Sequence, residues 1–182
     1  MSISRFDPTK PTRCVCCGES WLGRAEQPAV LQWMREYLLH HEIYISAVTL
    51  LERVRGYSVL WRRAGNDRRE RIEATRVAYL TNLGRVVALD GAIAVVAGEI
   101  MALLPEAPTP PRRSHHLAES RQERWARWRF DGMIAATALV ARLPLIHNNA
   151  PDFETIRSAI ETAPGRFPNL GPLQLIRCTS LA

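Results

Sequence analysis

Residues 131–153 read DGMIAATALVARLPLIHNNAPDF, and this stretch decides the predicted fold. Ile134, Ala138 and Ala141 recur at helical spacing, and the small residues between them permit close packing, which predicts a helix lying against a sheet. Pro144 ends that helix, and the apolar run after it is typical of a parallel strand covered on both faces. Ligands bind beyond the carboxyl ends of such strands, so we expect the chemistry in HNNAPDF.

The rest of the chain alternates between strand and helix patterns. Strands are predicted at residues 43–45, 85–89, 143–146 and 173–178, and helices at residues 28–41, 50–63, 68–82, 91–104 and 151–162. We expect Gly84 to close the helix at 68–82 in the left-handed conformation. Strands that alternate with long helices imply right-handed crossovers, so the sequence predicts an α/β fold with a central parallel sheet.

Length and composition predict one domain. The chain has 182 residues, 47% of them hydrophobic, which suffices for a sizeable core. Within this domain we expect an irregular N-terminal segment at residues 1–27 and a Pro-rich, basic insertion at residues 105–130. No apolar run is long enough to cross a bilayer and the N-terminus has no signal-peptide core, so the expected location is cytoplasmic, with no membrane partner.

The net charge of +6 favours polyanionic partners such as nucleic acid or an acidic protein. Most of the positive residues are arginine, which suits phosphate binding but equally reflects genomic base composition. In the insertion, Arg121, Arg124, Trp125 and Trp128 share a helical face that can hold phosphates and stack bases. The alternative is that both tryptophans pack the helix onto the body of the protein or onto a second subunit.

The cysteines are crowded near the N-terminus. Cys14, Cys16 and Cys17 do not resemble the framework of a secreted disulfide protein. A structural zinc site needs a second pair of ligands, and Cys178 is the only cysteine left. We therefore expect buried or unmodified thiols and a reducing compartment.

Acidic residues stand where the predicted strands lead into helices. Glu52 lies just after the strand at 43–45, Asp131 begins a helix and Asp152 follows the strand at 143–146. If the strands are parallel neighbours, these three carboxylates meet at one edge of the sheet, and Mg²⁺ or Mn²⁺ would relieve their repulsion. Each residue also has a structural alternative, since Asp is a good helix N-cap and an exposed helical Glu is ordinary.

Two polar residues, His147 and Asn149, lie close to Asp152 in the sequence. His147 is more often a hydrogen-bonded structural residue than a ligand, and Asn149 is more often a turn former.

A family resemblance favours the joint interpretation. ISAVTLLERVRG (residues 45–56), DGMIAATALV (131–140) and LPLIHNNAPDF (143–153) resemble successive motifs of PIN-domain proteins, above all the ribonuclease toxins (VapC-like) of VapBC-type toxin-antitoxin modules. The resemblance implies a three-layer α/β/α fold and Mg²⁺- or Mn²⁺-dependent endonucleolytic cleavage of RNA. It also implies a cognate antitoxin protein and a homodimer as partners.

The resemblance carries the family's acidic positions over onto Glu52, Asp131 and Asp152, as metal ligands or organisers of water. Asn149 matches the Asn of the strand-end turn and joins the expected catalytic set. His147 stands where the family usually has Thr or Ser.

The N-terminus departs from the family pattern. Members open with a strand that ends in a metal-binding Asp, but the corresponding residues 14–17 contain no Asp. Asp7 is the upstream candidate for that metal ligand and Glu19 a weaker one. Two other hypotheses stay open: a degenerate PIN scaffold that binds an antitoxin-like protein or RNA without cutting, and an unrelated α/β protein with N-capping acids.

Overall fold

The computed structural model describes residues 13–16, 36–37, 39–104, 106 and 120–177. Its sheet has five strands in the order β3-β2-β1-β4-β5, and every neighbouring pair is parallel. The strands are β1 (Arg13–Cys16), β2 (Glu42–Ser46), β3 (Arg85–Val87), β4 (Leu145–His147) and β5 (Leu175–Arg177). The predicted parallel sheet is confirmed.

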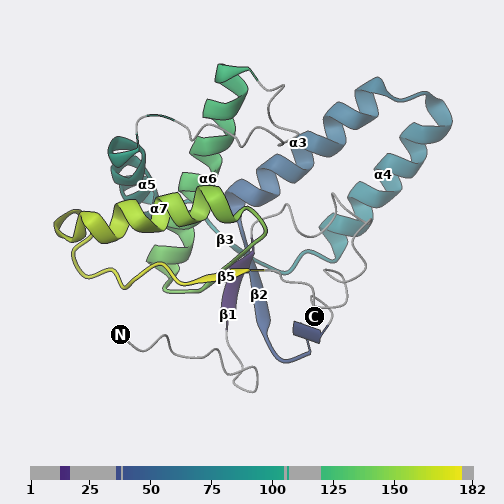
Figure 1. The fold of residues 1–182 in the computed structure, drawn as a ribbon. Coiled ribbons are helices and arrows are strands. Elements are labelled where there is room, and N and C mark those ends of the chain that lie inside the picture. Colours follow the sequence, from purple (N-terminus) through teal and green to yellow (C-terminus); the bar gives the residue numbers. More distant parts are fainter. Residues whose placement is uncertain (1–12, 17–35, 38, 105, 107–119, 178–182) are drawn as a thin grey trace.

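Helices connect and cover these strands (Figure 1). Those within the described residues are α3 (Ala47–Arg63), α4 (Asn66–Thr81), α5 (Gly91–Leu103), α6 (Arg121–Ala141), α7 (Ala150–Thr162) and the short 3-10 helix η2 (Pro164–Arg166). None of them is long and apolar enough to span a membrane. The arrangement is a parallel sheet flanked by helices, which confirms the predicted three-layer α/β/α fold.

The hydrophobic core lies between the sheet and the helices α5, α6 and α7, which pack on one another. Its centre is made of fully buried aliphatic and aromatic side chains from strands and helices far apart in sequence, among them Val15, Leu145, Phe153 and Ile156, each 0% exposed. These contacts fix α6 and α7 relative to β1 and β4, the strands whose carboxyl ends lead toward the candidate site.

The central strand lies inside the segment that we expected to be irregular. β1 pairs with β2 on one side, Cys16 opposite Ile45, and with β4 on the other, Cys16 opposite Ile146. The predicted irregularity of residues 1–27 is therefore wrong for residues 13–16. Most of the helix predicted at residues 28–41 lies outside the described residues.

Helix α6 is longer than the helix predicted from Asp131. It begins at a capping box in which Ser120 accepts a hydrogen bond from the Glu123 backbone N–H, and the Glu123 carboxylate accepts one from the Ser120 N–H. Asp131 consequently lies in the interior of α6, so its alternative role as an N-cap is excluded. The helix ends at Ala141, and its C-cap, Arg142, is left-handed with φ 53°.

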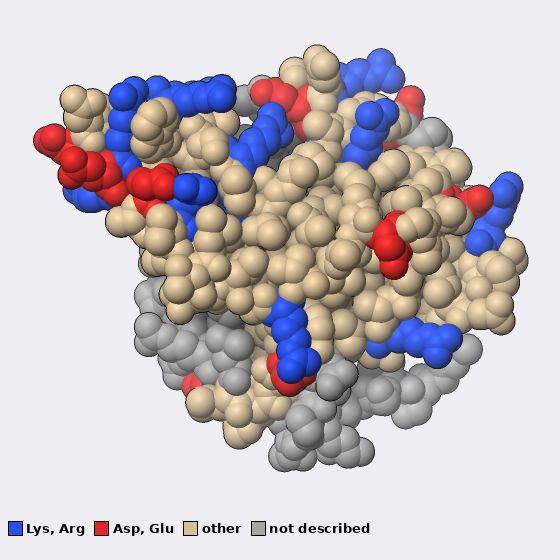
Figure 2. All heavy atoms as spheres, turned by 180° about the vertical axis from the view of Figure 1, so that it is seen from behind, with Lys and Arg blue, Asp and Glu red and all other residues tan. Residues whose placement is uncertain are grey.

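Helices α3 and α4 form an antiparallel arm that projects from the body (Figure 1). The buried residues of α3 are Val48 and Thr49 in its first turn, and α4 has none. Trp61 and Val77 are 42% and 49% exposed. Seen from behind, the arm carries basic and acidic side chains next to one another (Figure 2).

Gly84 has a different role from the one predicted. No described glycine has a positive φ, and α4 is capped instead by Asn82 with φ −96°. A Cβ atom at Gly84 would lie 3.2 Å from the Ile43 carbonyl oxygen. A larger side chain would press on the backbone of β2. The predicted left-handed closure is wrong.

Candidate metal centre

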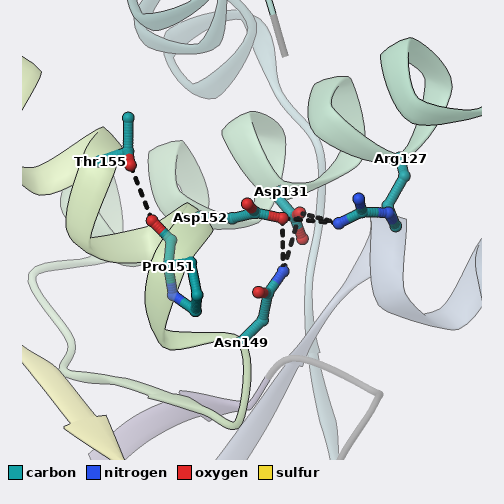
Figure 3. Close-up of polar contacts among 6 residues, drawn as sticks. All are labelled: Arg127, Asp131, Asn149, Pro151, Asp152 and Thr155. Carbon is teal, nitrogen blue, oxygen red and sulfur yellow. Dashed lines mark hydrogen bonds and ion pairs between the residues drawn. The ribbon is translucent and has the colours of Figure 1, made fainter. Parts of the chain in front are cut away.

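Asp131 and Asp152 meet because α6 and α7 cross beside the carboxyl end of β4 (Figure 3). Asp131 projects from the middle of α6, and Asp152 lies in the first turn of α7, where the helix dipole favours a carboxylate. Each residue is only 7% exposed. The N-cap of α7 is Asn149, so Asp152 does not have the N-cap position that was its structural alternative.

Asn149 holds the two carboxylates together. Its side-chain Nδ2 donates to Asp152 Oδ2 at 2.7 Å and to Asp131 Oδ2 at 3.4 Å. As the N-cap of α7, its backbone is fixed by the same turn that ends β4. A side chain that binds both acids from a fixed turn orients their Oδ2 atoms toward the same point (Figure 3).

A fourth residue completes the cluster, and the sequence analysis did not single it out. The Arg127 Nη1 donates to Asp152 Oδ2 at 2.6 Å and lies 3.9 Å from Asp131 Oδ2. Arg127 lies one helical turn before Asp131, an i,i+4 spacing that places both side chains on one face. That spacing is the sequence signal for this contact, and the many other arginines of the segment obscured it.

Glu52 comes from a different helix. It lies on α3, which packs against α6, and its side chain is half-buried. Across the described ranges, no three His, Cys, Asp or Glu side chains come close enough together to hold a metal ion. Of the predicted set, the structure thus brings together Asp131, Asp152 and Asn149.

The strand that opens the family motif contributes no acid here. β1 has the sequence RCVC, and the Sγ atom of its buried Cys14 lies 3.7 Å from the Glu42 carbonyl oxygen as a hydrogen-bond donor. Asp7 and Glu19, the two candidates for a further ligand, lie outside the described residues, as do Cys17 and Cys178.

The donor set nevertheless fits a hard divalent cation. Mg²⁺ is commonly held by one or two carboxylates, with water and substrate oxygens filling its other positions. Asp131 and Asp152 direct oxygen atoms to a common point where positive charge is already favoured, because the Arg127 guanidinium binds there. The oxygen donors suit Mg²⁺ or Mn²⁺ better than a soft metal.

His147 lies at the end of β4 and is 1% exposed. Its ring packs on Phe153 at 5.2 Å between centroids, and its Nδ1 has no hydrogen-bond partner among the described residues. Burial lowers the pKa of His147 to about 4, and the positive charge of Arg177 acts in the same direction. The imidazole is therefore neutral at pH 7, as expected for a packing residue rather than a cationic phosphate ligand.

The candidate RNA-binding residues divide into two groups. Trp128 is 3% exposed, and its Nε1 donates to the Leu104 carbonyl oxygen at 3.2 Å, so it anchors α6 to the core. Trp125 is half-buried and carries the Arg129 guanidinium over its ring at 4.7 Å. Arg121 is exposed and Arg124 is half-buried. The second group comprises Trp125, Arg121 and Arg124, which remain near or at the surface.

The family of this chain follows from its sequence profile. The profile described as PIN domain matches residues 20–157, which include all of β2, all of α3 and the complete Asp131–Asp152 cluster. The chain belongs to the PIN-domain family. Membership supports a nuclease activity in general. Comparison with curated protein sequences finds no match.

Solved structures with the same fold come from toxin-antitoxin complexes. VapBC2 from Rickettsia felis, bound to a DNA fragment from the promoter, gives a TM-score of 0.56 at 15% identity, covering 91% of this chain and 98% of that chain. DNA-bound VapBC from Salmonella typhimurium gives 0.56 at 17% identity, covering 93% and 99%. VapBC-1 from nontypeable Haemophilus influenzae gives 0.54 at 16% identity, covering 92% and 98%. At such identities the likeness concerns the fold alone.

Proposed function

We propose that this PIN domain is a Mg²⁺- or Mn²⁺-dependent endoribonuclease that acts as the toxin of a toxin-antitoxin module. The observation that carries the proposal is the convergence of Asp131 and Asp152 on one point, organised by Asn149, at the carboxyl edge of a parallel sheet. That edge is where α/β folds bind their ligands. The nuclease family supplies the reaction class.

In this proposal the buried acids hold the cation and Asn149 keeps them aligned. The cation, when bound, supplies Lewis acidity toward a phosphodiester and makes water a better nucleophile. Asp131 and Asp152 provide its protein oxygens, and their low exposure limits competition from bulk water. Glu52 on the neighbouring helix α3 is proposed to order water at the edge of the site, and Asp7 to add a further ligand.

RNA is the proposed substrate because the chain carries Lys+Arg 24 against Asp+Glu 18. Arg121, Arg124 and Trp125 on the first turns of α6 lead along one helix toward Asp131. Arginines on that path can hold backbone phosphates without reading sequence. RNA affinity that stays flat as salt concentration rises would argue against this part of the proposal.

The proposed partners are an antitoxin protein, a second copy of this chain and RNA, in the cytoplasm. The support is that the similar folds cited above come from VapBC complexes. An arm with an exposed apolar face, including Leu60, Trp61 and Val77, is consistent with a protein partner.

A second candidate function rests on the missing acid. β1 carries no carboxylate, and the described acids form no cluster of three. A scaffold with an incomplete metal site would bind RNA or an antitoxin-like protein without cutting. This degenerate-scaffold hypothesis makes the same binding predictions as the nuclease but predicts no cleavage.

The deciding experiment incubates purified, antitoxin-free protein with a mixed RNA pool in Mg²⁺, in Mn²⁺ and in EDTA. The parent should cut only with a divalent cation, and Asp131→Asn should lose at least about a hundredfold in rate, since it removes a metal-binding carboxylate. Asp67→Asn, in the first turn of α4 on the arm, is the matched control and should cut like the parent. No cutting by folded parent protein would favour the degenerate scaffold.

A further inference from the structure

The Arg127 guanidinium occupies the point toward which both candidate metal ligands are directed. Its Nη1 contacts Asp152 Oδ2 at 2.6 Å and lies 3.9 Å from Asp131 Oδ2 (Figure 3). These are the same two oxygens that Asn149 binds and that would hold a divalent cation. One position between two carboxylates cannot hold both a guanidinium nitrogen and a metal ion.

The surroundings make this exclusion strong. The side chains of Asp131 and Asp152 are 10% and 11% exposed, and that of Arg127 is 20% exposed. Solvent screens charges weakly at such sites, so a guanidinium and a divalent cation a few ångströms apart repel each other. A charge-assisted hydrogen bond as short as that between Arg127 and Asp152 must also break before the cation takes its place.

Arg127 has room to leave. Its side chain is more exposed than those of the two acids, and it reaches them from the preceding turn of α6 through a long flexible stem. Asp131, Asp152 and Asn149 are held by the helices and the turn that carry them. The arginine can therefore swing away while the oxygen donors stay in position.

We propose that Arg127 is a positioning residue that competes with the divalent cation: it holds the Asp131 and Asp152 carboxylates together and must be displaced when the metal binds. The inference rests on the proposed function, because it takes these two acids as metal ligands. It assigns to Arg127 two effects of opposite sign, stabilising the metal-free fold and weakening the affinity for metal.

The test measures binding of Mn²⁺ alone, from the electron paramagnetic resonance signal of the unbound ion, without RNA. Arg127→Met removes the charge and keeps the stem, and it should bind Mn²⁺ at least about tenfold more tightly than the parent. Arg129→Met removes an equal charge from the same helix, but from a guanidinium that lies over Trp125, and should match the parent. Asp152→Asn should weaken binding in both the parent and Arg127→Met.

Thermal unfolding supplies a second readout. In EDTA, Arg127→Met should unfold at a lower temperature than the parent, because two nearly buried carboxylates no longer have the positive charge of the guanidinium beside them. Mn²⁺ should raise its unfolding temperature more than that of the parent. Arg127→Gln, whose amide still donates to a carboxylate without a charge, gives the same comparison should the Met variant fail to fold.

The outcomes separate this inference from the proposed function. If the parent and Arg127→Met bind Mn²⁺ with equal affinity, and Asp152→Asn abolishes that binding in both, Arg127 does not compete with the metal. The proposed metal site is then still supported. Absence of Mn²⁺ binding by every folded variant overturns both. A purely structural role for Arg127 would lower stability without raising the affinity for Mn²⁺.

Discussion

The body and the arm are built from helices of similar length but differ in burial. The body contains α6 and α7, and the arm consists of α3 and α4. Helix α6 buries residues on most of its second half, whereas α4 has no buried residue among its 16. The body carries the candidate site, and the arm exposes apolar side chains beside mixed charges (Figure 2). A helical pattern in the sequence thus says little about how firmly the helix is held.

This difference assigns different tasks to the two regions. A catalytic site of the kind proposed needs side chains held within a fraction of an ångström, and α6 and α7 are closely packed. An element with few buried contacts opens more readily and can adapt its surface to a partner. The following predictions test this division, from the largest expected effect to the smallest.

The largest effect is expected from truncating the body. Ile156 on α7 is 0% exposed and belongs to the core, so Ile156→Ala should lower the free energy of unfolding by about 2–5 kcal/mol through lost burial and a cavity. Urea denaturation measures it. A loss below about 1 kcal/mol would mean that α7 is no better packed than the arm, and the comparison would fail.

The second prediction concerns the pH dependence of the body. The pKa of His147 in the folded chain is about 4, below the ordinary value of 6.5, because the ring is buried. Between these values the unfolded chain binds a proton that the folded chain does not, so stability should fall as pH drops from 6.5 toward 4. The expected loss is about 2–3 kcal/mol, and none of it should appear above pH 7.

His147→Gln is the control for that prediction. It keeps a polar side chain of similar length but cannot titrate, so its stability should depend less on pH over the same interval. Denaturation curves at pH 7 and pH 4.5 decide the matter. A parent and variant with parallel pH profiles would show that other groups cause the acid sensitivity.

A smaller effect is expected at the start of α6, where the helix leaves the body. Ser120→Ala removes the capping box and should cost about 1 kcal/mol, with faster amide hydrogen exchange in the first turn of α6. Ser58→Ala, on the exposed face of α3, is the matched control, because that hydroxyl only donates to the Val54 carbonyl of its own helix. If Ser120→Ala and Ser58→Ala lower the free energy of unfolding equally, the capping box does not specifically stabilise α6.

The smallest effect is expected on the arm. Val77 on α4 is 49% exposed, and Val77→Ala should change the free energy of unfolding by less than about 0.5 kcal/mol, because little burial is lost and alanine favours helices. The same urea measurement applies as for Ile156→Ala. A loss of roughly 2 kcal/mol or more, as large as at a core position, would show that the arm is packed more tightly than its exposure indicates.

Much of the fold could be predicted because its signals are local. Alternating strand and helix patterns gave α3, α4, α5 and α7 to within a few residues, and the apolar run before His147 gave β4. The same stretch placed Asp152 and Asn149 at a strand end, where they lie. These predictions depend on periodicity and on turn residues, which a single sequence carries.

The remainder depends on contacts that the sequence does not display. β1 is four residues with two cysteines between prolines and a glycine, and its strand identity comes from pairing with β2 and β4. In the sequence, Arg127 is one arginine among several, and its contact with Asp152 on α7 exists only in the folded structure. Trp128 packs onto the core, which was one of the two alternatives for the tryptophans, but the hydrogen bond from its ring nitrogen to the Leu104 carbonyl oxygen comes only from the fold.

The position of β1 has a consequence for the synthesis of the chain. Val15 at the centre of the sheet pairs with Leu145, so one side of the strand waits for a partner that the ribosome makes much later. At ribosomal rates of about 5–20 residues per second, that delay is on the order of ten seconds. A nascent chain therefore cannot assemble the α6–α7 cluster before Asp152 has been made and has left the ribosome.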